Sequence, residues 1–242
     1  CEVSNREKVI LNGNRKPIML LHKKVPEYLP EDIAPKQKRL GVMLPYAPLQ
    51  LLLFSEDLDY LVMTSGNISG LPICYQDDAA IKTLGTVAEY LLTHNREIKL
   101  AVDDAVVKVV GDYEVLVRCG RGYAPLTIPL KSGNEILALG AEQKSSVCIA
   151  RNGFSTISQY IGDLSEYQIY QVFERQIEHF KDLFQFRPEI LAHDLNPDSL
   201  STRYAKKQTG HKMAVGHHHA HMAGCMAENK LTCDVIGVIC DG

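Results

Sequence analysis

The sequence has 242 residues, of which 45% are hydrophobic and 23% are charged, and its formal net charge is -3. This composition is typical of a folded globular protein and excludes collagen, coiled coil or general disorder as the main state. No apolar run approaches the ~18–20 residues that a membrane-spanning helix needs, so we expect no membrane association. The slight acidic excess gives no support to nucleic-acid binding, whose usual footprint is a basic surface.

The seven cysteines are spread along the chain, are odd in number and form no CxxC pair. This pattern argues against a disulfide framework and against a cysteine-rich zinc site. Several cysteines lie in apolar, strand-like runs, so we expect buried free thiols and a reducing, cytoplasmic location.

The chain divides into two blocks, because Pro, Ser, Gly and Asn cluster at residues 129–134 between strand-like segments. We therefore predict one mixed α/β domain over residues 1–130 and a second over residues 136–242. In the first block, apolar runs at 18–21 and 60–63 predict strands, and the latter ends in the polar loop TSGN. A hairpin is predicted around Gly111-Asp112, and a short helix from Asp77 to Leu84.

The second block has a more regular pattern. Residues 136–139, 146–150 and 154–160 predict three strands, and Asn152-Gly153 is a favoured hairpin turn between the last two. A capping box at Ser165 and Gln168 predicts the start of a long helix. Further elements then alternate: strand 190–192, helix 199–208, strand 213–215, helix 217–229 and strand 235–240.

This order, β-β-β-α-β-α-β-α followed by another strand, is typical of the ribonuclease-H-like half of actin-type nucleotide-binding folds. In such folds two halves face each other across a nucleotide. The fold expected for the whole chain is therefore mixed α/β.

The clearest chemical signal is the run HHHAH at 217–221, which holds four of the nine histidines. On a helix, His217 and His221 lie on one face at i and i+4, and two imidazoles at this spacing can bind one metal ion. No glutamate follows as in HExxH, so the metalloprotease interpretation fails. The alternative is a polar helix start without a ligand role.

A two-histidine site needs a further ligand, and Asp241 is the best candidate because it follows an apolar run and precedes a glycine. A carboxylate beside two imidazoles suits zinc or iron, and the pattern does not choose between them. The alternative is an ordinary strand-end aspartate.

Other polar segments could bind phosphate or a nucleotide. Lys144 lies in the loop GAEQKSS, whose small and polar residues suit phosphate contact. Ser65 and Asn67 could present a hydroxyl and an amide to an adenylate, and Arg118 precedes a glycine-rich turn. Each of these segments could equally be an ordinary polar turn or surface charge.

Together, the motifs resemble one family. The matching stretches are LVMTSGNISGLPI, RCGRGYAP, LALGAEQKSS, HDLNPDSLSTRYA, HHHAH and VIGVICDG, and they occur in the family's order. The chain resembles the HypF family of carbamoyltransferases, which help to build the cyanide ligands of nickel–iron hydrogenase. The resemblance implies that block one is the later part of a YrdC-like domain and block two the first half of a Kae1-like domain.

Family members are longer, so the resemblance implies a fragment that we expect to be inactive alone. The whole enzyme would release carbamate from carbamoyl phosphate, join it to ATP as carbamoyl adenylate, and pass the carbamoyl group to the C-terminal cysteine of the partner HypE. The resemblance identifies no catalytic residue in this chain. It does match the following positions to family sites: His217, His221 and Asp241 to the metal ligands, Ser65, Asn67 and Arg118 to the YrdC-like nucleotide site, and Lys144 to a phosphate loop.

Two positions depart from the family. Where the family usually has Arg and Ser around V-D-D, this chain has Ala101 and Ala105. A charged hydrogen bond contributes ~1.5–3 kcal/mol, so phosphate binding at this place should be weaker. Two other functions stay open: a role in tRNA threonylcarbamoyl-adenosine synthesis, whose proteins share both domain types, and a non-catalytic module that binds a metal or a partner.

Overall fold

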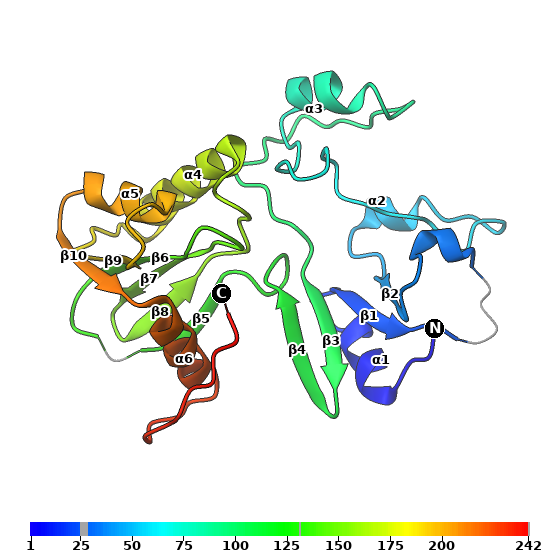
Figure 1. Cartoon of the computed structure of the whole chain (residues 1–242). Coiled ribbons are helices and arrows are strands. Elements are labelled where there is room, and N and C mark those ends of the chain that lie inside the picture. The colour runs from blue at the N-terminus through cyan, green and yellow to red at the C-terminus, as the bar shows by residue number, and fades with distance from the viewer. Residues whose placement is uncertain (25–28, 131, 242) are drawn as a thin grey trace. The chain divides into compact units, whose positions relative to one another are not determined.

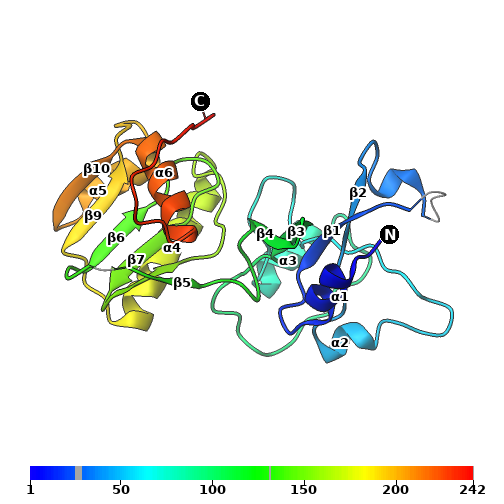
Figure 2. The same ribbon diagram turned by 90° about the horizontal axis from the view of Figure 1, so that it is seen from below.

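Two separate β-sheets organise the chain (Figure 1, Figure 2). The computed structural model describes residues 1–24, 29–130 and 132–241. The chain forms two units, the first made of Cys1–Ser69 and Ile73–Ala124, and the second of Gly70–Pro72 and the chain from Pro125 onwards. In the described part of the chain, no helix has both the length and the apolar character needed to cross a membrane.

The first unit contains a four-stranded sheet in the order β2-β1-β3-β4. Strands β1 and β3 are parallel, and the other two pairs are antiparallel. The buried core lies between this sheet and helix α1 and consists of Ile10, Leu11, Met19, Leu21 and Val107. The elements of the unit are α1 (Asn5–Asn12), β1 (Ile18–His22), η1 (Glu31–Ile33), β2 (Arg39–Val42), α2 (Pro48–Leu51), α3 (Asp77–Leu84), β3 (Val106–Val110) and β4 (Tyr113–Arg118).

The strand predicted at 60–63 is wrong. This segment is irregular, and Tyr60, Val62 and Met63 are exposed. An apolar run forms a strand only where a neighbouring strand takes up its backbone hydrogen bonds, and none of the described strands pairs with it. The hairpin predicted at Gly111-Asp112 is confirmed between β3 and β4, as is the helix Asp77–Leu84.

The second unit contains a six-stranded sheet in the order β10-β9-β6-β7-β8-β5. Strands β6, β9 and β10 run parallel, whereas β7, β8 and β5 add antiparallel strands on one side. The predicted order β-β-β-α-β-α-β-α is confirmed, and with it the ribonuclease-H-like arrangement. The elements are β5 (Leu126–Pro129), β6 (Ile136–Leu139), β7 (Val147–Arg151), β8 (Phe154–Ile157), α4 (Tyr167–Phe184), β9 (Ile190–Asp194), α5 (Leu200–Lys207), β10 (His211–Val215) and α6 (His217–Glu228).

Strand β5 falls within residues 1–130, which we assigned to the first block. It nevertheless pairs with β8, so its backbone hydrogen bonds belong to the second sheet.

Helices cover both faces of the second sheet, with α4 and α5 on one side and α6 on the other (Figure 1, Figure 2). Helix α4 buries Phe173, Ile177 and Phe180, which recur at the helical spacing that the sequence predicts. Phe173 is fully buried, and removing such a ring costs ~3–5 kcal/mol, so this helix is a main source of the unit's stability.

Two turns in the second unit test the local predictions. The Asn152-Gly153 turn is confirmed, because both residues have positive φ (50° and 81°) between β7 and β8. The capping box at Ser165 and Gln168 is wrong: α4 begins at Tyr167, and the Ser165 hydroxyl donates to the Asp163 carboxylate instead. A nearby side-chain acceptor therefore competes with the cap.

The strand predicted at 235–240 is also wrong. The segment forms no strand in the described chain, and Ile236 and Val238 are 96% and 86% exposed. The segment runs beside α6 instead. Gly237 is so close to Met222 on this helix that an added Cβ would lie 2.9 Å from the Met222 sulfur. This path brings Asp241 to the start of α6.

Candidate metal centre

The candidate site lies where two neighbouring parallel strands end. Strands β9 and β10 pair in register from Ile190 and His211 to Asp194 and Val215. After Val215, one glycine leads into α6, whose first residue is His217. Because parallel strands end at the same edge of a sheet, the end of β9 and the start of α6 are neighbours in space.

The structure brings together the three residues predicted as metal ligands. His217 Nε2 lies 3.0 Å and His221 Nε2 lies 2.8 Å from Asp241 Oδ2, and the two Nε2 atoms are 3.1 Å apart. Ligand atoms that bind one ion at about 2.0–2.2 Å lie roughly 3–3.5 Å from one another, so the donor set fits a single metal ion. Metal binding itself stays a prediction.

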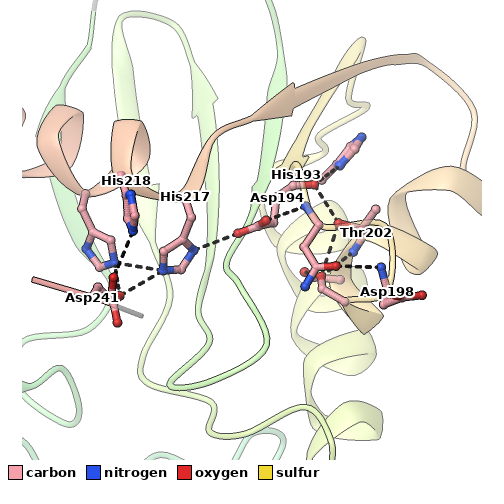
Figure 3. A network of polar contacts seen from close by, with 11 residues as sticks. His193, Asp194, Asp198, Thr202, His217, His218 and Asp241 are labelled. Carbon is pink, nitrogen blue, oxygen red and sulfur yellow. Dashed lines mark hydrogen bonds and ion pairs between the residues drawn. The ribbon is translucent and has the colours of Figure 1, made fainter. Parts of the chain in front are cut away.

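His217 lies between two carboxylates (Figure 3). Its Nδ1 is 2.9 Å from Asp194 Oδ2, and its Nε2 faces Asp241. The hydrogen bond with Asp194, and then that with Asp241, raises the pKa of His217 above its ordinary value. Burial alone would raise the pKa of Asp194, but the Asn196 N–H and His217 lower it overall, so this carboxylate stays charged.

His218 has a different place from its two neighbours in the motif. Its Nε2 lies 3.0 Å from the backbone carbonyl oxygen of Asp241, so it can hold the C-terminal segment against α6 (Figure 3). Neither this contact nor the role of Asp194 was predicted. The sequence does contain a signal for Asp194, because this residue stands at the end of a strand and is followed by the turn-forming residues LNPD.

Lys144 lies in the loop that follows β6 and is exposed, with a left-handed φ of 51°. Because β6 is parallel to β9, this loop leaves the sheet at the same edge as Asp194. Gly140 begins the loop, and a Cβ there would lie 2.7 Å from the Ser146 carbonyl oxygen, so the tight path requires glycine. Phosphate binding by Lys144 stays a prediction.

The predicted nucleotide residues of the first unit lie in two segments. The Ser65 hydroxyl donates to Asn67 Oδ1 within one irregular loop. Arg118 ends β4, and its Nε donates to the carbonyl oxygen of Asp104 at 3.0 Å. Convergence of these three side chains on one nucleotide stays a prediction.

The segments around Asp104 and Gly120 lie side by side. Arg121 forms an ion pair with Asp104 at 2.7 Å, and its guanidinium lies over the Tyr46 ring at 3.3 Å from the centroid. This arginine therefore supports the fold of the first unit. Ala105 is fully buried in the same contact, so a serine hydroxyl at this position would not reach solvent.

All seven cysteines are free, as expected. The expectation that they are buried is wrong: four are exposed and three are partly exposed. The exposed ones lie at the N-terminus and along α6 and the segment after it: Cys1, Cys225, Cys233 and Cys240.

Comparison with known proteins supports both units. The family model described as "HypF Kae1-like domain" matches residues 131–228, and the Sua5/YciO/YrdC model, described as "Telomere recombination", matches residues 2–120. The carbamoyltransferase HypF of Synechocystis sp. is 39% identical over 242 residues, which cover 99% of this chain and 32% of that protein. The probable carbamoyltransferase HypF of Methanocaldococcus jannaschii is 33% identical over 251 residues, covering 100% of this chain and 32% of that protein.

Two solved structures are similar over nearly the whole chain. A crystal structure of full-length HypF in the phosphate- and nucleotide-bound form gives a TM-score of 0.94 at 43% identity, covering 100% of this chain and 39% of that one. The structure of T. kodakarensis HypF gives 0.89 at 35% identity, covering 95% of this chain and 31% of that one.

The fold and these matches define the class of protein: an α/β chain that joins a YrdC-like portion to a Kae1-like portion with a His-His-Asp cluster. The chain belongs to the HypF family. It spans about a third of the length of the curated relatives it matches.

Proposed function

We propose that this chain is part of a carbamoyltransferase of hydrogenase maturation and contributes a metal-binding site to carbamoyl transfer. The observation that carries the proposal is the cluster of His217, His221 and Asp241 on the Kae1-like portion. The names of the relatives, which are carbamoyltransferases, support the class of reaction.

The proposed reaction has three steps in the whole protein. Water splits carbamoyl phosphate into carbamate and phosphate. Carbamate then attacks the α-phosphate of ATP, giving carbamoyl adenylate and pyrophosphate. Finally, the C-terminal cysteine thiol of HypE bonds to the carbamoyl carbon, AMP leaves, and the thiol loses its proton.

The cluster would hold zinc or iron through His217 Nε2, His221 Nε2 and an Asp241 oxygen. When bound, such an ion supplies Lewis-acid polarisation of a carbonyl or phosphoryl oxygen. Both imidazoles are partly exposed, with side chains 38% and 52% accessible, so an exchangeable ligand can reach the site.

ATP would be bound by other residues. Lys144 lies in the loop that leaves the sheet at the same edge as the cluster. It would contact a phosphate of a nucleotide bound to the Kae1-like portion. Ser65, Asn67 and Arg118 would bind the adenylate on the YrdC-like portion. Ala101 removes a cation relative to the family, so we expect weaker ATP binding there. Ala105 is fully buried, so the hydroxyl that it lacks would not reach ATP.

The metal proposal is tested by the metal content of the purified chain after loading with zinc or iron. We expect one ion per chain in the wild type and little in the double variant His217→Ala/His221→Ala. His219→Ala is the matched control, because His219 is exposed in the same motif and lies outside the cluster. Equal metal content in the double variant and the control would contradict the site.

The transfer proposal is tested with a chimera in which residues 1–242 replace the matching stretch of the Synechocystis relative. The chimera receives carbamoyl phosphate, ATP and HypE, and the carbamoylated cysteine is detected by mass spectrometry. We expect transfer by the chimera and none by residues 1–242 alone, because these span about a third of the relatives. A folded, metal-loaded chimera that forms no product would contradict the proposal.

The same assay distinguishes HypE as the acceptor from the alternative role in tRNA modification. Carbamoylation of HypE is expected, whereas a role in tRNA modification predicts AMP release that depends on tRNA and threonine. The match of residues 131–228 to the HypF domain model favours the protein acceptor.

A further inference from the structure

Asp194 holds the nitrogen of His217 that faces away from the candidate ligand cluster. The Asp194 Oδ2 atom lies 2.9 Å from His217 Nδ1, while His217 Nε2 faces Asp241 (Figure 3). The Asp194 side chain is only 12% exposed, whereas that of Asp241 is 48% exposed. Asp194 is therefore placed to act on His217 from inside the protein.

The position of the Asp194 carboxylate is fixed by its surroundings. Its Oδ1 accepts a hydrogen bond of 2.7 Å from the backbone N–H of Asn196. The Asp194 carbonyl oxygen accepts one of 2.9 Å from the Thr202 hydroxyl on α5. The next residue, Leu195, donates its N–H to Val215 at the end of β10. The turn thus holds the carboxylate directly, while the strand and the helix hold the backbone that carries it.

This arrangement selects one form of the histidine ring. A neutral imidazole carries its proton on one nitrogen, and the ionised Asp194 oxygen can only accept. Asp241 is a second acceptor, at Nε2. When Nε2 and Asp241 are taken up by a metal ion, the proton of the ring belongs on Nδ1, where Asp194 accepts it. In the described part of the chain His221 has no such partner, because its hydrogen bonds both use Nε2.

We propose that Asp194 is a positioning residue that fixes the Nδ1–H tautomer and the ring orientation of His217, so that Nε2 is free to bind a metal ion. The proposal rests on the metal site proposed above and extends it to a residue outside the ligand set. Metal-binding histidines commonly donate their second N–H to a carboxylate in this way.

Asp194→Asn is a sharp test because it keeps the size of the side chain. Its amide oxygen can still accept from Asn196, and this orients the amide NH₂ group towards His217 Nδ1. That group donates, so it favours the tautomer with the proton on Nε2, the ligand atom. The matched control is Asp198→Asn in the same turn, because the Asp198 carboxylate is 84% exposed.

The first readout is the affinity of the 242-residue chain for Zn²⁺, measured by competition with a chromogenic chelator. We expect Asp194→Asn to bind zinc ~10–100-fold more weakly than the wild type, and Asp198→Asn to bind like the wild type. Unchanged melting temperatures would show that both variants fold. Wild-type zinc affinity in Asp194→Asn would overturn the proposal.

The second readout needs no metal. Asp241→Ala is the background for this measurement, because it removes the competing acceptor at Nε2. Long-range ¹H–¹⁵N spectra of this metal-free chain, recorded at alkaline pH where the ring is neutral, identify the protonated nitrogen of His217. We expect Nδ1–H in this background and with Asp198→Asn added, and Nε2–H with Asp194→Asn added. A ring protonated on Nε2 while Asp194 is present would contradict the role of Asp194. If the wild type bound no zinc, the proposed metal site would fail while this measurement still decided the tautomer.

Discussion

Glu142 and the first residue of α5 are joined by a hydrogen bond: Glu142 Oε2 accepts from the backbone N–H of Leu200 at 2.7 Å. Glu142 lies in the loop that carries Lys144, and α5 also supports Asp194 through Thr202. One side chain thus ties the candidate phosphate loop to the helix behind the candidate metal centre.

Replacing Glu142 by alanine should therefore destabilise the second unit. The Leu200 N–H would lose a charged acceptor at a helix start, and such a loss costs ~1–3 kcal/mol. Urea unfolding followed by circular dichroism measures the change. Glu166→Ala is the control, because Glu166 is exposed before α4 and makes no side-chain cap. Equal stability of the two variants would show that the Glu142 contact contributes nothing.

Gly120→Ala should destabilise the first unit. A Cβ at this position would lie 2.3 Å from the Asp103 carbonyl oxygen and 2.8 Å from the Ala105 nitrogen, both backbone atoms that cannot move cheaply. We expect a loss of ~1–3 kcal/mol, as for other overpacked sites. Gly133→Ala is the comparison, since among the described residues other than its two chain neighbours no atom lies within 4 Å of its added Cβ. A Gly120→Ala chain that melts with the wild type would contradict the close approach of these segments.

Cys148 should react more slowly with iodoacetamide than the exposed cysteines of the second unit. It lies on β7, and burial raises its pKa to about 11. At pH 8 only roughly one Cys148 in 1,000 is then a thiolate, whereas an ordinary thiol with pKa ~8.5 is about one-quarter ionised. Peptide mass spectrometry after timed labelling gives the order of reaction. Labelling of Cys148 as fast as Cys225 would contradict the partial burial of Cys148.

The elements that the sequence predicts correctly are those with local causes. The buried face of α4 repeats at helical spacing, and the Asn152-Gly153 turn requires the positive φ that these residues tolerate. The wrong strands, 60–63 and 235–240, have the right composition but no described strand beside them. Strand formation depends on a partner far away in the sequence, which composition does not reveal.

The same distinction explains the site. The pairing of His217 and His221 follows from helix geometry alone. The apolar run before Asp241 points to the third residue, although this run forms no strand and reaches the cluster by running beside α6. Asp194 lies 23 residues before His217 and meets it only because β9 and β10 are parallel neighbours in register. Its role becomes visible once that pairing is known.

The most direct test of the metal centre is an anomalous difference map from a crystal of the chain grown with zinc or iron and recorded across both absorption edges. One peak should lie within about 2.0–2.2 Å of His217 Nε2, His221 Nε2 and an Asp241 oxygen. The edge at which the peak appears identifies the metal. A fully loaded crystal with its only peaks elsewhere, or with no metal between these three side chains, would contradict the account.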